Sequence, residues 1–234
     1  MLITLFTLIF VMAVRAPIDT DTWWHIRSGE HTLNEGMIYS DPFSHTKTGE
    51  EWINHSWGAQ VIMYGVWELA GNVGLALLTA TLATAGMAAI YPICAGNSYS
   101  RAFALVLGAT TAAVFWSARP QMISFFFSAI VVYWLYSYKS GRPYKGTSSD
   151  NYANKETIQD DTLIRPYKRF DRLWLLVPLM LVWGNLHAGF SIAYILIFAF
   201  VVGETVAYWF DPNDKSLIAP AGIRKLVLVT LVSV

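Results

Sequence analysis

Two acidic residues and a histidine follow the first apolar segment of the chain, within the sequence PIDTDTWWHIRSGE. If Asp19 caps a helix, then Asp21 and His25 lie one turn apart on the same helix face. There a carboxylate can orient an imidazole or share a metal ion with it. Such a pair suits acid/base chemistry, which makes Asp21, His25 and Asp19 the candidate catalytic residues. The structural alternative is that both aspartates only start the helix, with Trp23 and Trp24 as ordinary anchors at a membrane interface.

A second polar element, WINHSW, places Asn54 and His55 between Trp52 and Trp57. The faces of sugar rings stack on indoles while their hydroxyls form hydrogen bonds. Together with Trp24, this element therefore predicts a binding site for a sugar or a lipid head group. The alternative is a loop that docks on an aromatic belt at the membrane surface.

Two more polar elements lie at turns between apolar segments. SARPQ contains Arg119 and Gln121, and WGNLHAGF contains Asn185 and His187. The planar fork of an arginine suits phosphate, although an arginine in a turn also snorkels to water without any ligand. A lone histidine in a membrane is often only a hydrogen-bonded packing residue. As candidate functional residues, all four are expected to bind substrate.

The histidines do not have the spacing of a zinc site. His25 and His31 lie six positions apart, on different sides of a helix, and neither HxxxH nor HExxH occurs. One metal hypothesis stays open. A divalent cation would bind Asp21 or Asp19, with a substrate phosphate completing its coordination shell.

The elements that must position these residues are apolar. The 234 residues are 55 % hydrophobic and only 14 % charged, and the mean hydropathy is +0.41. A soluble fold could not easily hide so much apolar surface, and 16 basic residues balance 16 acidic ones, which disfavours nucleic acid as a partner. Segments suited to span a membrane are 1–16, 72–95, 102–118, 120–138, 173–188, 189–210 and a start at 225. We therefore expect an all-α fold, a polytopic transmembrane helical bundle of about six or seven spans in contact with membrane lipid.

Residues 1–234 are expected to form a single transmembrane domain. The first outer loop, 15–71, should contain short interfacial helices, among them 57–70, which is too short to span and is followed by Gly71. The last apolar segment stops at Val234, so the chain is expected to be the N-terminal part of a longer protein.

The positions of Lys and Arg predict the orientation, because basic loops stay in the cytoplasm. If the first helix runs outward, twelve of the 16 basic residues are cytoplasmic, most of them in the polar linker 139–172. The other four and all five histidines then lie outside. Polar groups are costly at membrane depth, so the outer cluster should line a water-filled hollow at the non-cytoplasmic surface.

The order of a short first span, DTDTWWHIRSGE, DPFSHT, WINHSW, RPQ and NLHAGF resembles bacterial multi-spanning proteins related to the GT-C glycosyltransferases. That superfamily includes the dolichyl-phosphate-mannose protein mannosyltransferases and the aminoarabinose transferases. The resemblance implies an integral protein of the bacterial cytoplasmic (inner) membrane. It would transfer a sugar from a polyprenyl-phosphate donor to an acceptor, with its active site facing outside.

In that superfamily an acidic motif just after the first span supplies the base or orients the acceptor. By position and context, Asp21 before Trp23 and Trp24 matches this motif. Thr22 stands where a second acid often follows, and Asp19 is the candidate replacement.

Physical reasoning gives the remaining residues their roles. A polyprenyl phosphate lies in the bilayer with its phosphate at the interface, so a base must lie just above the membrane and cations at helix ends. His25 would orient the acceptor, Arg119 and His187 would hold the phosphate, and Trp24 and Trp57 would shape the sugar site.

Two other functions stay open. One is a non-catalytic protein that binds or assembles lipid-linked glycans on the same fold. The other is a transporter, which should carry charges in the middle of its spans. Only Glu68 and Glu204 come near such positions, and both lie toward segment ends.

Overall fold

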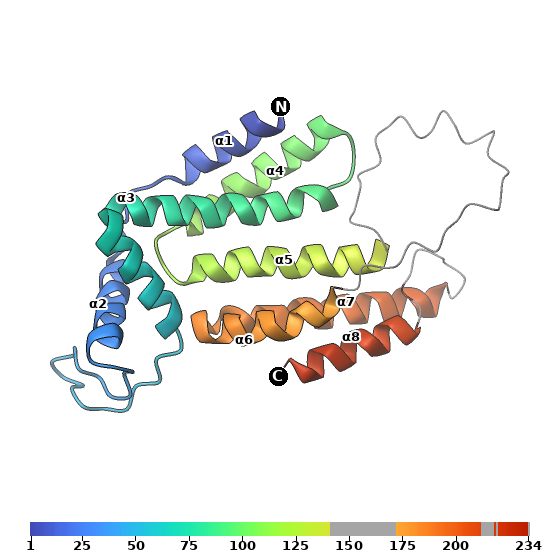
Figure 1. Ribbon diagram of the computed structural model, residues 1–234. Helices are drawn as coiled ribbons and strands as arrows, with labels where there is room; N and C mark the ends of the chain where they lie inside the picture. The colour runs from blue at the N-terminus through green and yellow to red at the C-terminus, as the bar shows by residue number, and fades with distance from the viewer. Residues whose placement is uncertain (141–171, 212–217, 219, 234) are drawn as a thin grey trace.

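The computed structural model describes residues 1–140, 172–211, 218 and 220–233 (Figure 1). Within this part of the chain the regular structure is helical, with one isolated β-bridge between Ser40 and Glu51. The α-helices are α1 (Leu2–Ala13), α2 (Thr20–Asn34), α3 (Trp57–Ile90), α4 (Ser98–Ala112), α5 (Gln121–Ser140), α6 (Leu176–Leu186), α7 (Ser191–Phe210) and α8 (Pro220–Val232). The expected all-α class is confirmed for these residues.

Helix α3 turns sharply at Gly71, where φ is 55° and ψ is −144°. Glycine adopts such a backbone conformation readily because it has no Cβ. The half of α3 before Gly71 lies beside α2, and the half after it joins the other long helices (Figure 1). The boundary expected between 57–70 and 72–95 is therefore confirmed, although the second half ends at Ile90 and a 3-10 turn, Tyr91–Ile93, follows it.

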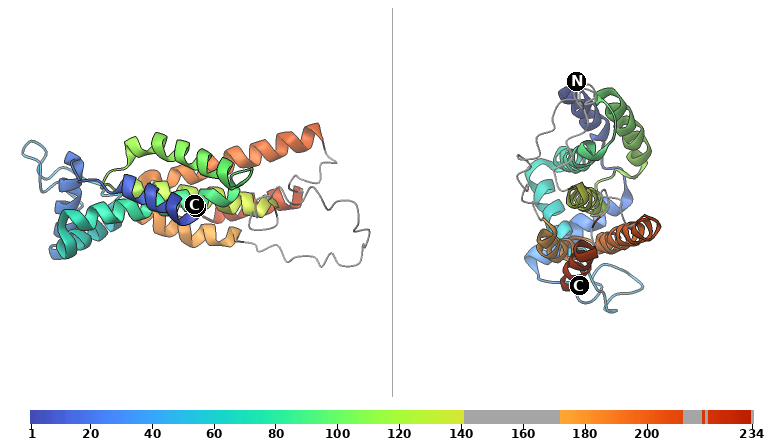
Figure 2. Two further views of the ribbon diagram at one scale, coloured as in Figure 1. Left: turned by 90° about the horizontal axis from the view of Figure 1, so that it is seen from above. Right: turned by 90° about the vertical axis from the view of Figure 1, so that its right-hand side faces the viewer.

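Three apolar clusters hold the helices together. One joins α1 to the second half of α3, to α4 and to the start of α5, and another joins α5, α6, α7 and α8. A smaller cluster joins α2 to both halves of α3. The fully buried Ala80 and Ala83 of α3 belong to the same cluster as Leu5, Ile9 and Ala13 of α1. Small side chains of this kind allow helices to pack closely. Figure 2 shows α1 and α8 on opposite sides of the bundle.

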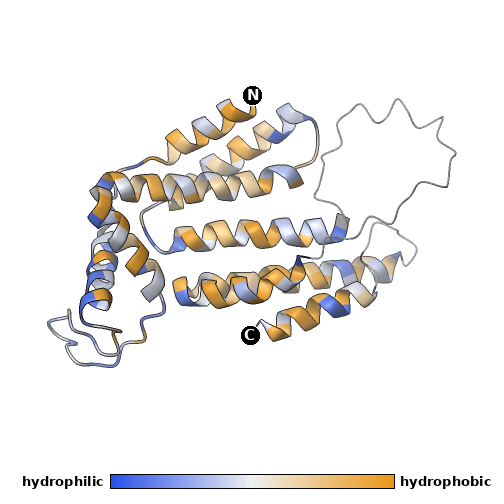
Figure 3. Ribbon diagram, in the orientation of Figure 1, coloured by the Kyte–Doolittle hydropathy of each residue, from blue (hydrophilic) through white to orange (hydrophobic). Residues whose placement is uncertain are grey.

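Three described helical segments are long and apolar enough to cross a membrane: Trp57–Ile93, Gln121–Lys139 and Ala188–Phe210. Leu2–Ala13 and Leu173–Leu186 form shorter apolar helices. Large hydrophobic side chains also cover the outside of the bundle, and Figure 3 shows apolar residues on both its inner and outer faces. Helices that are apolar all round suit a lipid surrounding.

The two ends of the bundle differ in chemistry. Helix α2 and the first half of α3 cross the end where α1 and α6 stop and where α5 and α7 begin (Figure 1). At the other end Lys139 of α5 pairs with the buried Glu204 of α7, whose second oxygen accepts a hydrogen bond of 2.9 Å from the amide of Ile218. The polar linker expected at 139–172 lies outside the described residues, apart from its ends.

Candidate functional site

Asp19 and Thr22 hold the N-terminal end of helix α2 in place at the site. The Asp19 carboxylate accepts a hydrogen bond of 3.0 Å from the amide of Asp21, and Asp19 is the N-cap of α2 as expected. The fully buried hydroxyl of Thr22 donates to the carbonyl of Ala118 at 2.9 Å. Helix α2 is thereby attached to the turn that carries Arg119.

Arg119 lies between the two aspartates. One nitrogen of its guanidinium donates to Asp19 at 3.3 Å, and another donates to Asp21. All three side chains are partly exposed: Arg119 is 32 % exposed, Asp19 25 % and Asp21 39 %. The sequence pattern had suggested that Asp21 orients His25, but its partner is Arg119. The two carboxylates neutralise the arginine and leave one negative charge in excess, so a phosphate has to compete with them for Arg119.

His25 belongs to a buried hydrogen-bond chain that continues into Gln60 and Asn54. The side-chain amide of Gln60 lies 3.3 Å from Nδ1 of His25, and its oxygen accepts from Asn54 at 2.7 Å. Because an amide NH₂ only donates, Nδ1 accepts and the Nε2 atom of a neutral ring carries the proton. Burial, the positive charge of His187 and, more weakly, that of His55 lower the pKa of His25 to about 4 against the opposing effect of Asp19.

The approach of α2 to α3 depends on Gly29. A Cβ at this position would lie 2.2 Å from the backbone oxygen of Gln60. Gln60 is a member of the site that sequence reasoning missed. An isolated polar residue in the apolar run 57–70 was the only local signal.

His187 is held by a second group of side chains. Its Nδ1 lies 2.7 Å from the hydroxyl of Ser124 and accepts from the amide of Gly189 at 3.0 Å, while the buried indole of Trp183 donates to Ser124 at 2.8 Å. These contacts leave the proton of a neutral imidazole on Nε2. Burial, followed by the charges of His55 and Arg119, lowers the pKa of His187. Ser124 and Trp183 had no distinguishing sequence signal within their apolar segments.

The aromatic residues of the site lie against these polar groups. The ring of Trp24 stacks on that of His25, with centroids 3.9 Å apart, and the indole of Trp57 donates to Asn185 at 3.3 Å. His55 is exposed, and its charge lowers the pKa values of both His25 and His187. The structure thus brings six residues to the same end of the bundle: Trp24, His25, His55, Trp57, Asn185 and His187.

Gln121 is the expected site residue that faces elsewhere. Its side-chain amide donates to the carbonyl of Phe115 at 2.9 Å and contacts the Ser117 hydroxyl at 3.4 Å. Both contacts brace the turn before α5. Gln121 therefore supports the position of Arg119 through the backbone of that turn.

The metal hypothesis has little geometric support. Across the residues that the structure describes, no group of three or more His, Cys, Asp or Glu side chains is placed to hold a metal ion. A cation bound by Asp19 and Asp21 would compete with Arg119, which already pairs with both.

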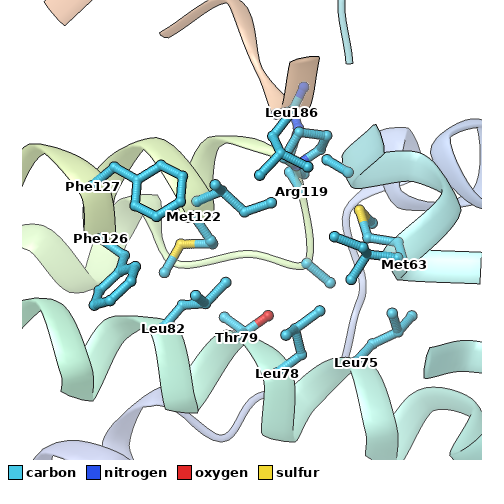
Figure 4. Close-up of a pocket in the computed structure, with 15 residues that line it drawn as sticks. Met63, Leu75, Leu78, Thr79, Leu82, Arg119, Met122, Phe126, Phe127 and Leu186 are labelled. Atoms are coloured by element: carbon cyan, nitrogen blue, oxygen red, sulfur yellow. The ribbon is translucent and has the colours of Figure 1, made fainter. Parts of the chain in front are cut away.

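An apolar cavity of about 210 Å³ opens next to Arg119 (Figure 4). Its walls come from both halves of α3, from α5 and from the end of α6, and Thr79 and Arg119 are the polar residues among those that line it. The larger wall residues include Met63, Leu75, Leu82, Met122, Phe126 and Leu186. A cation at the edge of an apolar cavity suits a ligand with an anionic head and a hydrocarbon chain.

The site therefore combines an aspartate–arginine pair, two neutral imidazoles and an apolar cavity. Carboxylates and neutral imidazoles accept protons, and a guanidinium and imidazole N–H groups stabilise developing negative charge. Comparison of the chain with protein-family models, with curated proteins and with solved structures gives no match.

Proposed function

We propose that this protein is a GT-C-type membrane glycosyltransferase that transfers a sugar from a polyprenyl-phosphate donor to an acceptor at the non-cytoplasmic face. The observation that carries the proposal is the placement of the Asp21–Arg119 pair beside the apolar cavity. A lipid-linked sugar phosphate needs an apolar channel, a cation for its phosphate and a nearby base. The order of the sequence motifs, which resembles that superfamily, supports the same assignment.

The proposed arrangement has about six or seven spans, with α2 and the first half of α3 lying along the outer interface. The three long apolar segments support this, as do the shorter helices packed beside them. In this arrangement the Lys139–Glu204 pair lies at the cytoplasmic end, and Lys139 is the first residue of the basic segment 139–172 of the sequence. The positive-inside rule gives the same orientation.

In the proposed reaction the hydrocarbon chain of the donor enters the cavity, and its phosphate takes hydrogen bonds from Arg119 and from Nε2–H of His187. The acceptor hydroxyl attacks the anomeric carbon, and the bond from that carbon to the phosphate oxygen breaks. The electron pair stays on the lipid phosphate, and the hydroxyl proton goes to Asp21. Because the phosphate competes for Arg119, donor binding frees Asp21 to act as the base.

A second candidate is a non-catalytic protein that binds or assembles lipid-linked glycans. One observation favours it: Asp21 is already paired with Arg119, and Thr22 occupies the position of the usual second acid. A transporter is a weaker candidate, because Glu204 pairs with Lys139 near a helix end and so has a structural role.

The test uses the full-length protein in liposomes with a radiolabelled polyprenyl-phosphate sugar and membrane extract as the acceptor source. Loss of a general base lowers transfer by about 100-fold or more, so Asp21→Asn should be nearly inactive. Glu35→Gln is the matched control, because Glu35 is the C-cap of α2, at the end of the helix away from Asp21, where its carboxylate lies 3.4 Å from His31. Equal transfer by Asp21→Asn and wild type removes Asp21 from the mechanism. Donor binding without transfer by the wild type supports the binding protein instead.

A further inference from the structure

The loop between α2 and α3 folds into a hollow of about 410 Å³ beside the site. Its aromatic wall is formed by Trp24, Phe43 and Trp52, with ring centroids 5.8 Å apart for the two tryptophans and 6.0 Å for Phe43 and Trp52. Trp24 also stacks on His25, so the hollow adjoins the proposed reaction centre.

Backbone hydrogen bonds shape this loop. The amide of Trp52 donates to Tyr39 at 3.0 Å, and the amide of Asp41 donates to Glu50 at 2.8 Å. The Asp41 carboxylate accepts from the amides of Phe43 at 2.8 Å and Ser44 at 3.0 Å. The aromatic wall is therefore held in place before any ligand binds, which lowers the entropy cost of binding.

The polar side of the hollow is acidic. It is lined by the carboxylates of Asp41, Glu50 and Glu51 against the single ammonium of Lys47, which pairs with both oxygens of Glu50 at 2.9 and 3.0 Å. The exposed carboxylate of Glu51 has no hydrogen-bonding partner among the described residues, so it can accept from a ligand.

Aromatic rings next to carboxylates suit a sugar. The apolar face of a sugar ring stacks on an indole, and its hydroxyls donate to carboxylate oxygens. Ordinary membrane anchoring by the same rings is disfavoured, because three carboxylates beside them repel an anionic lipid surface. An acidic sugar is disfavoured by the same repulsion.

We infer that this hollow binds a sugar ring of the acceptor, one that carries hydroxyls and no anionic group. Trp24 would then separate two neighbouring subsites, with the acceptor sugar against Trp52 and the donor phosphate near Arg119. This assignment of the acceptor rests on the proposed function, but binding in the hollow is measurable without any transfer.

The experiment uses saturation-transfer NMR on the full-length protein in nanodiscs free of sugar detergents. The probes are methyl β-D-glucopyranoside and its glucuronate analogue. We expect the neutral glycoside to give a signal at least about fivefold stronger than the glucuronate. Trp52→Ala should lower the neutral signal by about fivefold, because it removes one stacking surface. Trp209→Ala, at the far end of α7 and 80 % exposed, is the matched control and should leave the signal unchanged.

Glu51→Gln is a second test of the hollow, for use if Trp52→Ala fails to fold. Its carboxamide removes the repulsion and one acceptor, so the glucuronate signal should rise while the neutral signal falls. Equal signals from the two glycosides, or unchanged signals in both variants, would overturn the hollow as a sugar site. Sugar transfer that persists without binding in the hollow overturns only the acceptor assignment. Binding in the hollow by a protein that transfers nothing overturns only the proposed function.

Discussion

Arg119 donates to the carboxylate of Asp21, although 98 residues separate them in the chain. This pair joins the start of α2 to the turn before α5. It also places a carboxylate and a cation beside an apolar cavity, the arrangement on which the proposed function rests. In the proposed reaction, Asp21 becomes free to act as the base when the donor phosphate competes for Arg119.

The Asp21–Arg119 pair should show energetic coupling. We expect Asp21→Asn and Arg119→Gln each to lower the free energy of unfolding by about 1 kcal/mol, because both side chains are partly exposed and screened by water. The double variant should lose less than the sum of the two. Thermal unfolding of all four proteins in one detergent measures this. Strictly additive losses would show that the two side chains do not interact.

Lysine at position 119 should not support sugar transfer as well as arginine does. The guanidinium reaches two carboxylates through two nitrogens, and an ammonium lacks that planar fork. Arg119→Lys should therefore lower transfer by about tenfold or more at saturating acceptor, through weaker hold on the donor phosphate. The measurement is transfer against donor concentration, with Arg27→Lys, on the exposed face of α2, as the control. Wild-type kinetics for Arg119→Lys would remove the arginine from donor binding.

Stability should fall in acid because of His25. Its pKa is about 4 in the folded protein against 6.5 for a free side chain. Between these two pH values the unfolded chain binds a proton at His25 and the folded protein does not. The contribution of His25 to the free energy of unfolding is therefore fully present above about pH 6.5. It is lost progressively as the pH falls from 6.5 toward 4. His25→Gln should flatten the dependence of Tm on pH in that window. An unchanged slope in this variant would mean that His25 titrates normally.

Gly29 should be intolerant of any side chain. A Cβ there would meet the backbone of Gln60 at 2.2 Å, so Gly29→Ala must push α2 away from α3, at a cost of about 1–3 kcal/mol. Gly65→Ala is the matched control, since no atom lies within 4 Å of an added Cβ and alanine favours a helix. We expect Gly29→Ala to lower Tm and transfer together while Gly65→Ala keeps both. A Gly29→Ala protein as stable as the wild type would contradict this packing.

The hydroxyl of Ser124 should help to keep the imidazole of His187 neutral. Ser124→Ala removes a group that contacts Nδ1 and leaves the buried indole of Trp183 without its acceptor, which costs about 1–3 kcal/mol. Loss of the hydroxyl also removes a bond to the neutral ring, so the pKa of His187 should rise. The acid limb of the pH profile of transfer should then move to higher pH. Thr205→Ala, on α7 away from the site, should leave the profile in place.

Local features of the fold could be predicted from the sequence, while contacts between distant segments could not. Asp19 was identified as a helix cap and Gly71 as a helix boundary, because both depend on neighbouring residues. The partner of Asp21 depends on how α2 meets the turn at Ala118, which Thr22 fixes through a contact across 96 residues. Likewise, one-turn spacing suggested an Asp21–His25 pair, but His25 bonds to Gln60 from another helix.

The apolar cavity was also beyond sequence reasoning. Its walls come from helices that are apolar on all sides, so no periodic pattern marks the faces that meet there. Residues from both sides of the kink at Gly71 line the cavity.

We propose that residues from distant segments lie together at one membrane face. The direct test is an impermeant maleimide applied to single cysteines at positions 21, 119 and 185, in a Cys94→Ser background that removes the native cysteine. We expect all three to react in right-side-out vesicles, and we expect a cysteine in place of Lys139 to react only when the inner face is open. Reaction of positions 21 and 119 from opposite sides of the membrane would contradict it.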